Sequence, residues 1–405
     1  MIQTSPQLKN SGVRNAIVLS LAQAFNGAVG PIAIALGAIV GAQLMPQNIG
    51  LATLPVAGYS VGAALFALPV AMLTKTFGRR TGFIIGAAIG MLGACLASIA
   101  IFNTHFWLFC AGFLLLGGSG AFVQQYRFAA ADQGSDKFKA RAISWVLTGG
   151  VLAAIIGPKT AIFTKDLFAA TPHVGAFIAI VGLLSIGIII LYFLKPVTTV
   201  TATNAAQGSA ERSLPTIMKN PTFIVALLCA ISSYGLMTFM MTGAPLAMTH
   251  HHGFSEGQAI DGISYHVMAM FAPSFFTGLL IVKFGKPLVI GAGLALLLLC
   301  AGVALAGLEL WNFWTSLILL GVGWNFGFIG STALLGETYS ASEKNKVQGT
   351  HDFILFSFVA AAALLSGATL NAYGWHGIAK VLLPVATFSL AALIWLSSSR
   401  RKQTA

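Results

Sequence analysis

Two short stretches decide the fold of this chain: Lys-Thr-Phe-Gly-Arg at residues 75–79 and Val-Lys-Phe-Gly-Lys at residues 282–286. Their glycines, Gly78 and Gly285, are 207 positions apart. The same offset relates Ser-Asp-Lys-Phe-Lys-Ala-Arg-Ala, which begins at residue 135, to Ser-Glu-Lys-Asn-Lys-Val-Gln-Gly, which begins at residue 342. It also relates Trp107 to Trp314. One constant offset across several features predicts that the chain contains two copies of one unit.

The composition is that of a protein embedded in lipid. Of the 405 residues, 57% are hydrophobic and only 8% are charged, whereas a soluble domain carries about 25% charged residues. This excludes a soluble enzyme, a nucleic-acid-binding protein and a disordered chain. The four cysteines lie inside apolar stretches without a Cys-x-x-Cys spacing, so we expect neither a disulfide framework nor a metal site. No phosphate-binding loop is present, and we expect no cofactor.

Twelve apolar stretches are long enough to cross a hydrocarbon core of about 30 Å. They cover approximately residues 15–41, 50–73, 81–102, 106–130, 142–163, 174–194, 221–248, 258–282, 288–308, 311–335, 348–370 and 377–397. The first stretch is too long for a cleaved signal peptide. The sequence therefore predicts an all-α integral membrane protein with 12 transmembrane helices in two pseudo-symmetric six-helix bundles. The bundles would comprise residues 1–194 and 221–405, joined by a cytoplasmic linker at 195–220.

Basic residues indicate the orientation of these helices, because cytoplasmic loops carry an excess of Lys and Arg. With both termini placed inside, nineteen Lys and Arg residues fall on the cytoplasmic side, and only Lys159, Lys165 and Lys380 fall on the other. We therefore expect a multi-pass protein of the cytoplasmic (inner) membrane with both termini in the cytoplasm. The formal charge of +12 then reflects basic loops and not a nucleic-acid partner.

The six-plus-six arrangement, the long middle loop and the basic loop at 75–80 resemble the major facilitator superfamily. The family signature Gly-x-x-x-Asp-Arg-x-Gly-Arg-Arg falls on residues 71–80, where Gly78, Arg79 and Arg80 match. Ala71, Lys75 and Thr76 replace the first Gly, the Asp and the first Arg, and Gly285 stands at the related place in the second copy. The resemblance implies a secondary transporter that moves a small molecule by alternating access, a mechanism for which a monomer suffices.

The stretch 142–163 carries Gly149, Gly150 and the pair Gly157-Pro158. It resembles the Gly-Pro element of proton-coupled antiporters in this family, which implies efflux of a small organic solute. Physically, Pro removes a backbone hydrogen bond and Gly permits a bend, so the same residues also fit an ordinary packing kink. The antiporter branch carries an Arg in the fourth helix, where this chain has Leu114. Proton-symport uptake of a nutrient, vitamin or metal chelator is therefore the alternative.

Asp352 is the one acid that lies clearly within an expected span, and His351 precedes it. Charges inside a bilayer are costly and mark functional sites, which makes this pair a candidate for proton coupling. A second interpretation is a gate in which Lys75 pairs with Asp352 or with Glu337, with the polarity of the family's gate reversed. His266, which lies in the span 258–282, is a further titratable candidate.

Polar and aromatic residues inside the spans are candidates for a central cavity, since such sites combine apolar walls with a few hydrogen-bonding groups. Arg127 fits recognition of a polar or anionic substrate, or a side chain that extends to the interface. The candidates are Asn26, Tyr59, Arg127, Tyr234, Thr238, Trp324 and Asn325.

Three function classes remain open on the sequence alone. The first is a transporter that acts on a small molecule and protons in the lipid bilayer, either as an exporter or as an importer. The second is a receptor or scaffold with the same fold, which a lack of any solute flux would indicate. The third is a channel, which an unsaturable flux independent of any gradient would indicate.

Overall fold

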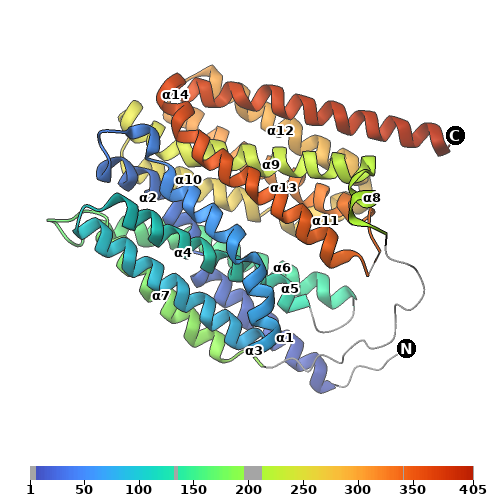
Figure 1. Cartoon of the computed structure of the whole chain (residues 1–405), viewed down its shortest axis with the longest axis horizontal. Helices are drawn as coiled ribbons and strands as arrows, with labels where there is room; N and C mark the ends of the chain where they lie inside the picture. Colours follow the sequence, from blue (N-terminus) through green and yellow to red (C-terminus); the bar gives the residue numbers. More distant parts are fainter. Residues whose placement is uncertain (1–5, 132–135, 196–211, 341, 405) are drawn as a thin grey trace.

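The computed structural model describes residues 6–131, 136–195, 212–340 and 342–404 of the chain. Throughout these ranges the regular secondary structure is helical (Figure 1). The helices form two bundles that lie side by side, one containing α1–α7 and the other α8–α14. We call these the first half and the second half. Helix α1 begins and α14 finishes at the same end of the molecule, which we call the terminal end.

The bounds of the elements are as follows. The first half comprises α1 Pro6–Asn26, α2 Val29–Leu44, the 3₁₀ turn η1 Ile49–Leu51, α3 Leu54–Phe102, α4 Phe106–Gln124, α5 Tyr126–Ala131, α6 Asp136–Thr164 and α7 Val174–Tyr192. The second half comprises α8 Leu214–Met218, α9 Pro221–Leu246, the π-helical turn η2 Ala247–His251, α10 Glu256–Phe271, α11 Ser274–Phe284, α12 Lys286–Ala306, α13 Leu310–Leu335 and α14 Lys344–Thr404.

The expected membrane spans all fall on these elements. In the described residues, ten helical segments are long and apolar enough to cross a membrane, and the bent pair α10 and α11 forms an eleventh. The segment Lys346–Arg400 contains two expected spans, which a bend at Gly374 separates. The fold class predicted from the sequence is therefore confirmed. Most of the expected linker lies outside the described residues, so its boundaries at 195 and 220 stay a prediction.

The two copies of the deciding loop have the same backbone geometry. Gly78, within α3, has φ 80° and ψ 161°, and Gly285, between α11 and α12, has φ 84° and ψ 156°. A positive φ is accessible to Gly but strained for residues with a Cβ. Each half therefore uses a glycine to reverse the chain at the corresponding loop, as the offset of 207 residues predicts.

Two spans that we expected to be continuous are broken. The first span divides into α1 and α2 at Gly27 and Ala28, and the span 258–282 bends by 41° between α10 and α11. At the second break, Asn325 Nδ2 donates to the Met270 carbonyl oxygen at 2.6 Å. Broken membrane helices need such partners, because freed backbone groups find no water in lipid.

Glycines allow the helices of the first half to pack closely. A Cβ at Gly117 of α4 would collide with the carbonyl oxygen of Tyr59 on α3, and a Cβ at Gly62 would collide with that of Leu114. Small residues permit this kind of backbone approach between membrane helices. The position of Tyr59 therefore depends on glycines in the facing helix.

Candidate functional site

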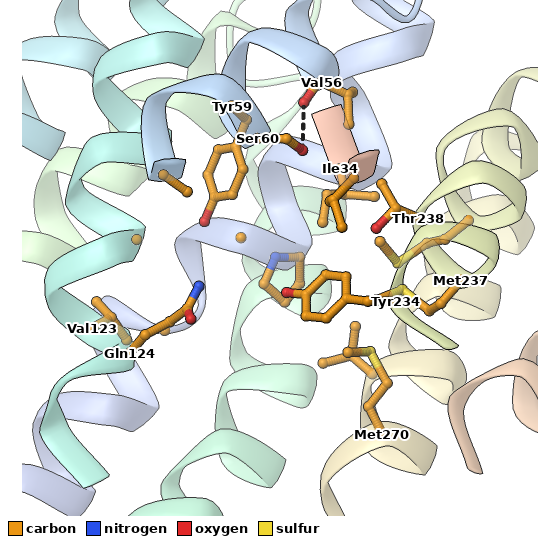
Figure 2. A pocket seen from close by; sticks show the side chains of 18 of the residues that line it. Ile34, Val56, Tyr59, Ser60, Val123, Gln124, Tyr234, Met237, Thr238 and Met270 are labelled. Carbon is orange, nitrogen blue, oxygen red and sulfur yellow. Dashed lines mark hydrogen bonds between the residues drawn. The ribbon is translucent and has the colours of Figure 1, made fainter. Parts of the chain in front are cut away.

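A cavity of about 180 Å³ lies between the two halves. Its walls come from α1, α2, α3, α4 and α6 of the first half and from α9, α10 and α14 of the second half (Figure 2). The break between α1 and α2 lies at the cavity, since Gln23, Asn26, Gly27, Gly30 and Pro31 all line it. Discontinuous helices at a substrate site are a recurring feature of secondary transporters.

The wall from the first half carries amides and hydroxyls. Gln23, Asn26, Tyr59, Ser60 and Gln124 line it. Asn26 is 2% exposed, and its Nδ2 donates to the hydroxyl of Tyr126 at 2.8 Å, so this amide also holds the first half together. Gln124 and the hydroxyl of Tyr59 point into the cavity (Figure 2).

Two glycines form the seat for Tyr59. A Cβ at Gly120 would lie 2.6 Å from the Tyr59 hydroxyl oxygen, and one at Gly30 would lie 3.3 Å from it. Because neither residue has a side chain, the phenol can pass between α2 and α4 and reach the cavity. The space left by these two glycines explains why the Tyr59 side chain reaches the cavity although α3 packs tightly against α4.

The wall from the second half carries thioethers and aromatic rings. Met237, Met241, Met270, Phe271 and Phe356 line it, together with Tyr234, Thr238 and Thr242. Sulfur and aromatic rings make favourable contacts with planar ligands, because both are polarizable. The amides of the cavity therefore lie on the first-half wall, whereas the thioethers and most of the aromatic rings lie on this wall, beside three hydroxyls.

An aromatic cluster holds the ring of Tyr234 in place. Its centroid lies 5.5 Å from that of Trp324, 5.2 Å from Phe328 and 5.7 Å from Phe356, each in edge-to-face geometry. Trp324 in turn stacks on Phe328 at 5.3 Å and 20°. The ring of Tyr234 extends from α9 across the cavity towards the first half (Figure 2).

Four of the seven predicted cavity residues line the cavity: Asn26, Tyr59, Tyr234 and Thr238. The structure places the other three elsewhere. Trp324 packs behind Tyr234, and Asn325 is fully buried, where it bonds to Met270, Ser274 and Thr277 at the helix break. Arg127 lies on α5, three residues beyond Gln124 towards the terminal end.

The predicted titratable groups are also outside the cavity wall. His266 is fully buried between α10 and α13, with Nδ1 2.8 Å from the Leu317 carbonyl oxygen. His351 is 1% exposed, and its Nδ1 lies 3.0 Å from Asp352 Oδ1. The Asp352 side chain is 55% exposed. Asp352 lies one helical turn before Phe356, so it borders the route from the cavity to the terminal end.

The predicted pairing of Lys75 with Glu337 is not formed in this structure. Glu337 instead bonds to Lys286 Nζ at 2.5 Å and to Arg400 Nη1 at 2.8 Å. Burial would raise the pKa of Glu337, but these two cations outweigh it and hold that pKa below its usual value. Lys75 is exposed on α3, three residues before the turn at Gly78.

The remaining residues predicted to guide conformational change, in the signature loop and in the stretch 142–163, make packing contacts. A Cβ at Gly149 would collide with the Ser20 carbonyl oxygen, and one at Gly157 would lie 2.6 Å from that of Ala28. Pro158 lies within α6, which packs against α1 and α2. Arg80 Cζ lies 3.9 Å from the ring centroid of Tyr192, and Arg79 also has an interaction partner. Gly157 and Pro158 thus fit a helix that packs closely beside the break at Gly27.

Sequence reasoning missed part of both walls. Gln23 and Gln124 are polar residues inside apolar stretches, and this signal was available in the sequence. Met237, Met241 and Met270 carry no such signal, because methionine is equally suited to lipid, helix contacts and cavities.

Ion pairs join the halves at the end opposite the termini. Lys159 Nζ lies 3.4 Å from Asp261 Oδ1, and Glu256 Oε2 lies 3.1 Å from Lys165 Nζ and 3.0 Å from His173 Nε2. The lysines and the histidine belong to the first half, and both acids belong to α10 of the second half. The halves are therefore connected by charge beyond the cavity.

Comparison with known proteins identifies the family. A family model described as Major Facilitator Superfamily matches residues 16–361 and 226–405. The riboflavin transporter RfnT of Brucella anthropi is 42% identical over 383 residues, which cover 94% of this chain and 95% of that protein. The uncharacterized MFS-type transporter YddS of Bacillus subtilis is 35% identical over 382 residues, which cover 90% of this chain and 86% of that protein.

Solved structures show the same fold. The nucleoside transporter NupG superimposes with a TM-score of 0.65 at 13% identity, over 96% of this chain and 98% of NupG. The human organic anion transporter MFSD10 gives 0.67 at 15% identity, over 96% of this chain and 100% of MFSD10. At such low identity these likenesses concern the fold alone. The matches along the whole sequence show that the chain belongs to the major facilitator superfamily and is a multi-pass membrane transporter.

Proposed function

We propose that this transporter takes up riboflavin, or a closely related planar heteroaromatic nutrient, across the cytoplasmic membrane. The observation that carries the proposal is a cavity whose first-half wall carries amides and whose second-half wall carries thioethers and aromatic rings. The relative named riboflavin transporter, which is similar over almost the whole chain, supports the same substrate class. This is the uptake alternative of the sequence analysis.

The chemistry of a flavin suits the two walls. Its ring system has an apolar benzenoid side, a side with carbonyl and N–H groups, and a flexible polyol chain. Tyr234 and the methionines would contact the faces and the apolar side of the ring, as aromatic rings and thioethers do in other ligand sites. Gln23, Gln124 and the hydroxyl of Tyr59 would bond the polar side and the polyol.

The ion pairs of Glu256 and Asp261 support a direction for this conformation. If the termini lie in the cytoplasm, as the basic loops predict, these pairs close the external side of the cavity. The conformation then corresponds to the stage at which substrate leaves towards the cytoplasm. We propose that the proton gradient drives accumulation, with Asp352 and His351 as the candidate groups for coupling.

The test is uptake of radiolabelled riboflavin by a bacterial strain that requires external riboflavin. We expect saturable uptake that depends on the transporter, is inhibited by unlabelled riboflavin and falls when a protonophore collapses the gradient. Growth on low riboflavin should improve in parallel. Faster loss of riboflavin from preloaded cells without uptake would show export and overturn the proposal. Binding of riboflavin without any flux would indicate a receptor and also contradict it.

A matched pair of variants connects the flux to the cavity. Tyr234→Ala removes the central ring, whereas Gly182→Val adds a side chain on α7 with no atom within 4 Å of the new Cβ. We expect the first variant to lose most of the uptake at low substrate and the second to retain it. Equal uptake by both would show that the substrate passes elsewhere.

A further inference from the structure

The two ends of the cavity differ in how the halves are connected. At the end opposite the termini, α6 and the segment between α6 and α7 bond to α10 through the pairs of Lys159, Lys165 and His173. Ser264 Oγ on α10 also donates to the Ala154 carbonyl oxygen of α6 at 2.7 Å. A transporter that alternates must break these contacts when that end opens. Contacts of similar strength must then form at the terminal end, because otherwise one conformation would dominate.

Arg127 occupies the first-half side of the terminal end. Gly120, Val123 and Gln124 line the cavity, and Arg127 follows one turn after Val123 and Gln124. Its Nε is buried and has no hydrogen-bond partner, and its guanidinium lies 4.8 Å from the ring centroid of Phe128. A buried donor without a partner is costly, so this arginine is suited to a partner that arrives in another conformation.

Asp352 occupies the second-half side of the same end. Phe356 and Val359 line the cavity, and Asp352 precedes Phe356 by one turn of α14. The carboxylate is more than half exposed, and the buried His351 beside it holds one of its oxygens at 3.0 Å. Arg127 and Asp352 thus lie one helical turn beyond cavity-lining residues, on opposite halves of the protein.

We infer that Arg127 and Asp352 form an ion pair that closes the terminal end of the cavity when the opposite end opens. The pair would replace the contacts of Glu256 and Asp261 and would balance the two conformations. Arginine suits this role, because its planar guanidinium can bond both oxygens of a carboxylate. The inference concerns the conformational cycle and holds for any substrate.

Arg127 thus takes the place that the sequence analysis assigned to Lys75. Lys75 is exposed on α3 near the turn at Gly78, and Glu337, its second predicted partner, is already bonded to Lys286 and Arg400. Arg127 is half-buried, its Nε lacks a partner, and it continues the cavity wall. Among these cations, its position favours it as the partner of Asp352.

Spin labels across the opposite end test the inference without any substrate. Cysteines replace the exposed Asn103 of the first half and Leu308 of the second half, in a full-length chain whose four native cysteines are changed to alanine or serine. Double electron–electron resonance then measures the distance between the two labels. Molecules in which the end opposite the termini is closed give the short distance, and molecules in which it is open give the long distance. Glu256→Gln weakens the contacts of this end and should enlarge the long-distance population, which makes it the reference background.

In that background, Arg127→Gln and Asp352→Asn should each reduce the long-distance population about fivefold, the effect of losing a moderately strong ion pair. The exchange Arg127→Asp with Asp352→Arg should restore it, and Lys75→Gln should leave it unchanged. Size-exclusion profiles and the conservative variant Arg127→Lys check that the protein remains folded.

Two outcomes would overturn the inference. One is a long-distance population that neither single variant reduces, or that the exchange fails to restore. The other is a reduction by Lys75→Gln but not by Arg127→Gln, which would assign the partner of Asp352 to Lys75. Neither outcome depends on riboflavin, so a failure here is distinct from a failure of the proposed function.

Discussion

The two halves of this transporter agree in their loops and differ in their walls. Gly78 and Gly285 have nearly identical backbone angles, as expected for two copies of one unit. At the cavity, however, the amides come from the first half and the thioethers from the second half, while both halves present hydroxyls. The duplicated scaffold therefore supports a site without internal symmetry. Such a site suits a ligand that has one hydrogen-bonding side and one apolar, polarizable side.

The largest effect should come from adding a side chain where α3 and α4 pack closely behind the first-half wall. In Gly117→Val the new Cβ meets the backbone oxygen of Tyr59, which cannot move without displacing α3. We expect a cost of about 3 kcal/mol or more, at the upper end of overpacking effects, and loss of most folded protein from the membrane. The yield of monodisperse protein and its melting temperature measure this effect.

Gly182→Val is the control for this prediction, because its Cβ meets no atom within 4 Å. It introduces the same residue type into another helix of the same half. If both valine variants were equally stable, the position of Tyr59 would not depend on the approach of α4. The first wall would then tolerate a wider spacing than the structure shows.

The second-largest effect should follow from deleting the ring at the centre of the second wall. Stacking of an aromatic side chain on a planar ligand contributes about 1–3 kcal/mol, so Tyr234→Ala should raise the KM for uptake by about 5- to 150-fold. Tyr234→Phe retains the ring and its contacts with Trp324, Phe328 and Phe356, and should stay close to the native value. A loss of equal size in the phenylalanine variant would mean that the hydroxyl, not the ring, contacts the substrate.

The fold could be predicted from the sequence almost completely, because lipid imposes a simple rule. Spans must be long and apolar, and the repeated glycines at 78 and 285 relate the halves. The breaks at Gly27 and between α10 and α11 could not be predicted. Gly and Pro are common in membrane helices, and a break depends on partners far away in the sequence, such as Asn325 for the Met270 carbonyl.

The site could be predicted only in part, and the two walls differ in this respect. Asn26 and Tyr59 were expected to line a cavity because polar groups in an apolar span require a hydrogen-bonding partner or ligand. Gln124 gives the same signal. Met270 gives none, because a methionine has the same appearance in a sequence whether it faces lipid, a helix or a cavity. Asn325 and Trp324 were expected to line the cavity but do not. Asn325 instead bonds to the Met270 carbonyl oxygen, and Trp324 stacks on Phe328.

A smaller effect should follow from removing one hydrogen-bonding group of the first wall. Gln124→Leu keeps approximately the same volume and removes the amide that points into the cavity. One lost hydrogen bond corresponds to about 0.5–1.5 kcal/mol, so we expect KM to rise about 2- to 12-fold with an unchanged maximal rate. Gln125→Leu is the matched control, because Gln125 follows directly and does not line the cavity. A larger rise in the control would place the substrate outside the cavity.

The smallest effect should come from replacing a methionine of the second-half wall by an apolar residue of similar volume. Met270→Leu retains an apolar side chain of similar volume, and such exchanges usually cost less than about 1.5 kcal/mol. If this wall recognises the ligand by shape and polarizability, uptake should remain within about threefold of the native value. Met270→Gln, of similar length but polar, should lower uptake further, because it introduces an amide that must be desolvated against an apolar ligand surface. Uptake that rises in the glutamine variant would show that the polar side of the substrate faces the second half, which would reverse the assignment of the two walls.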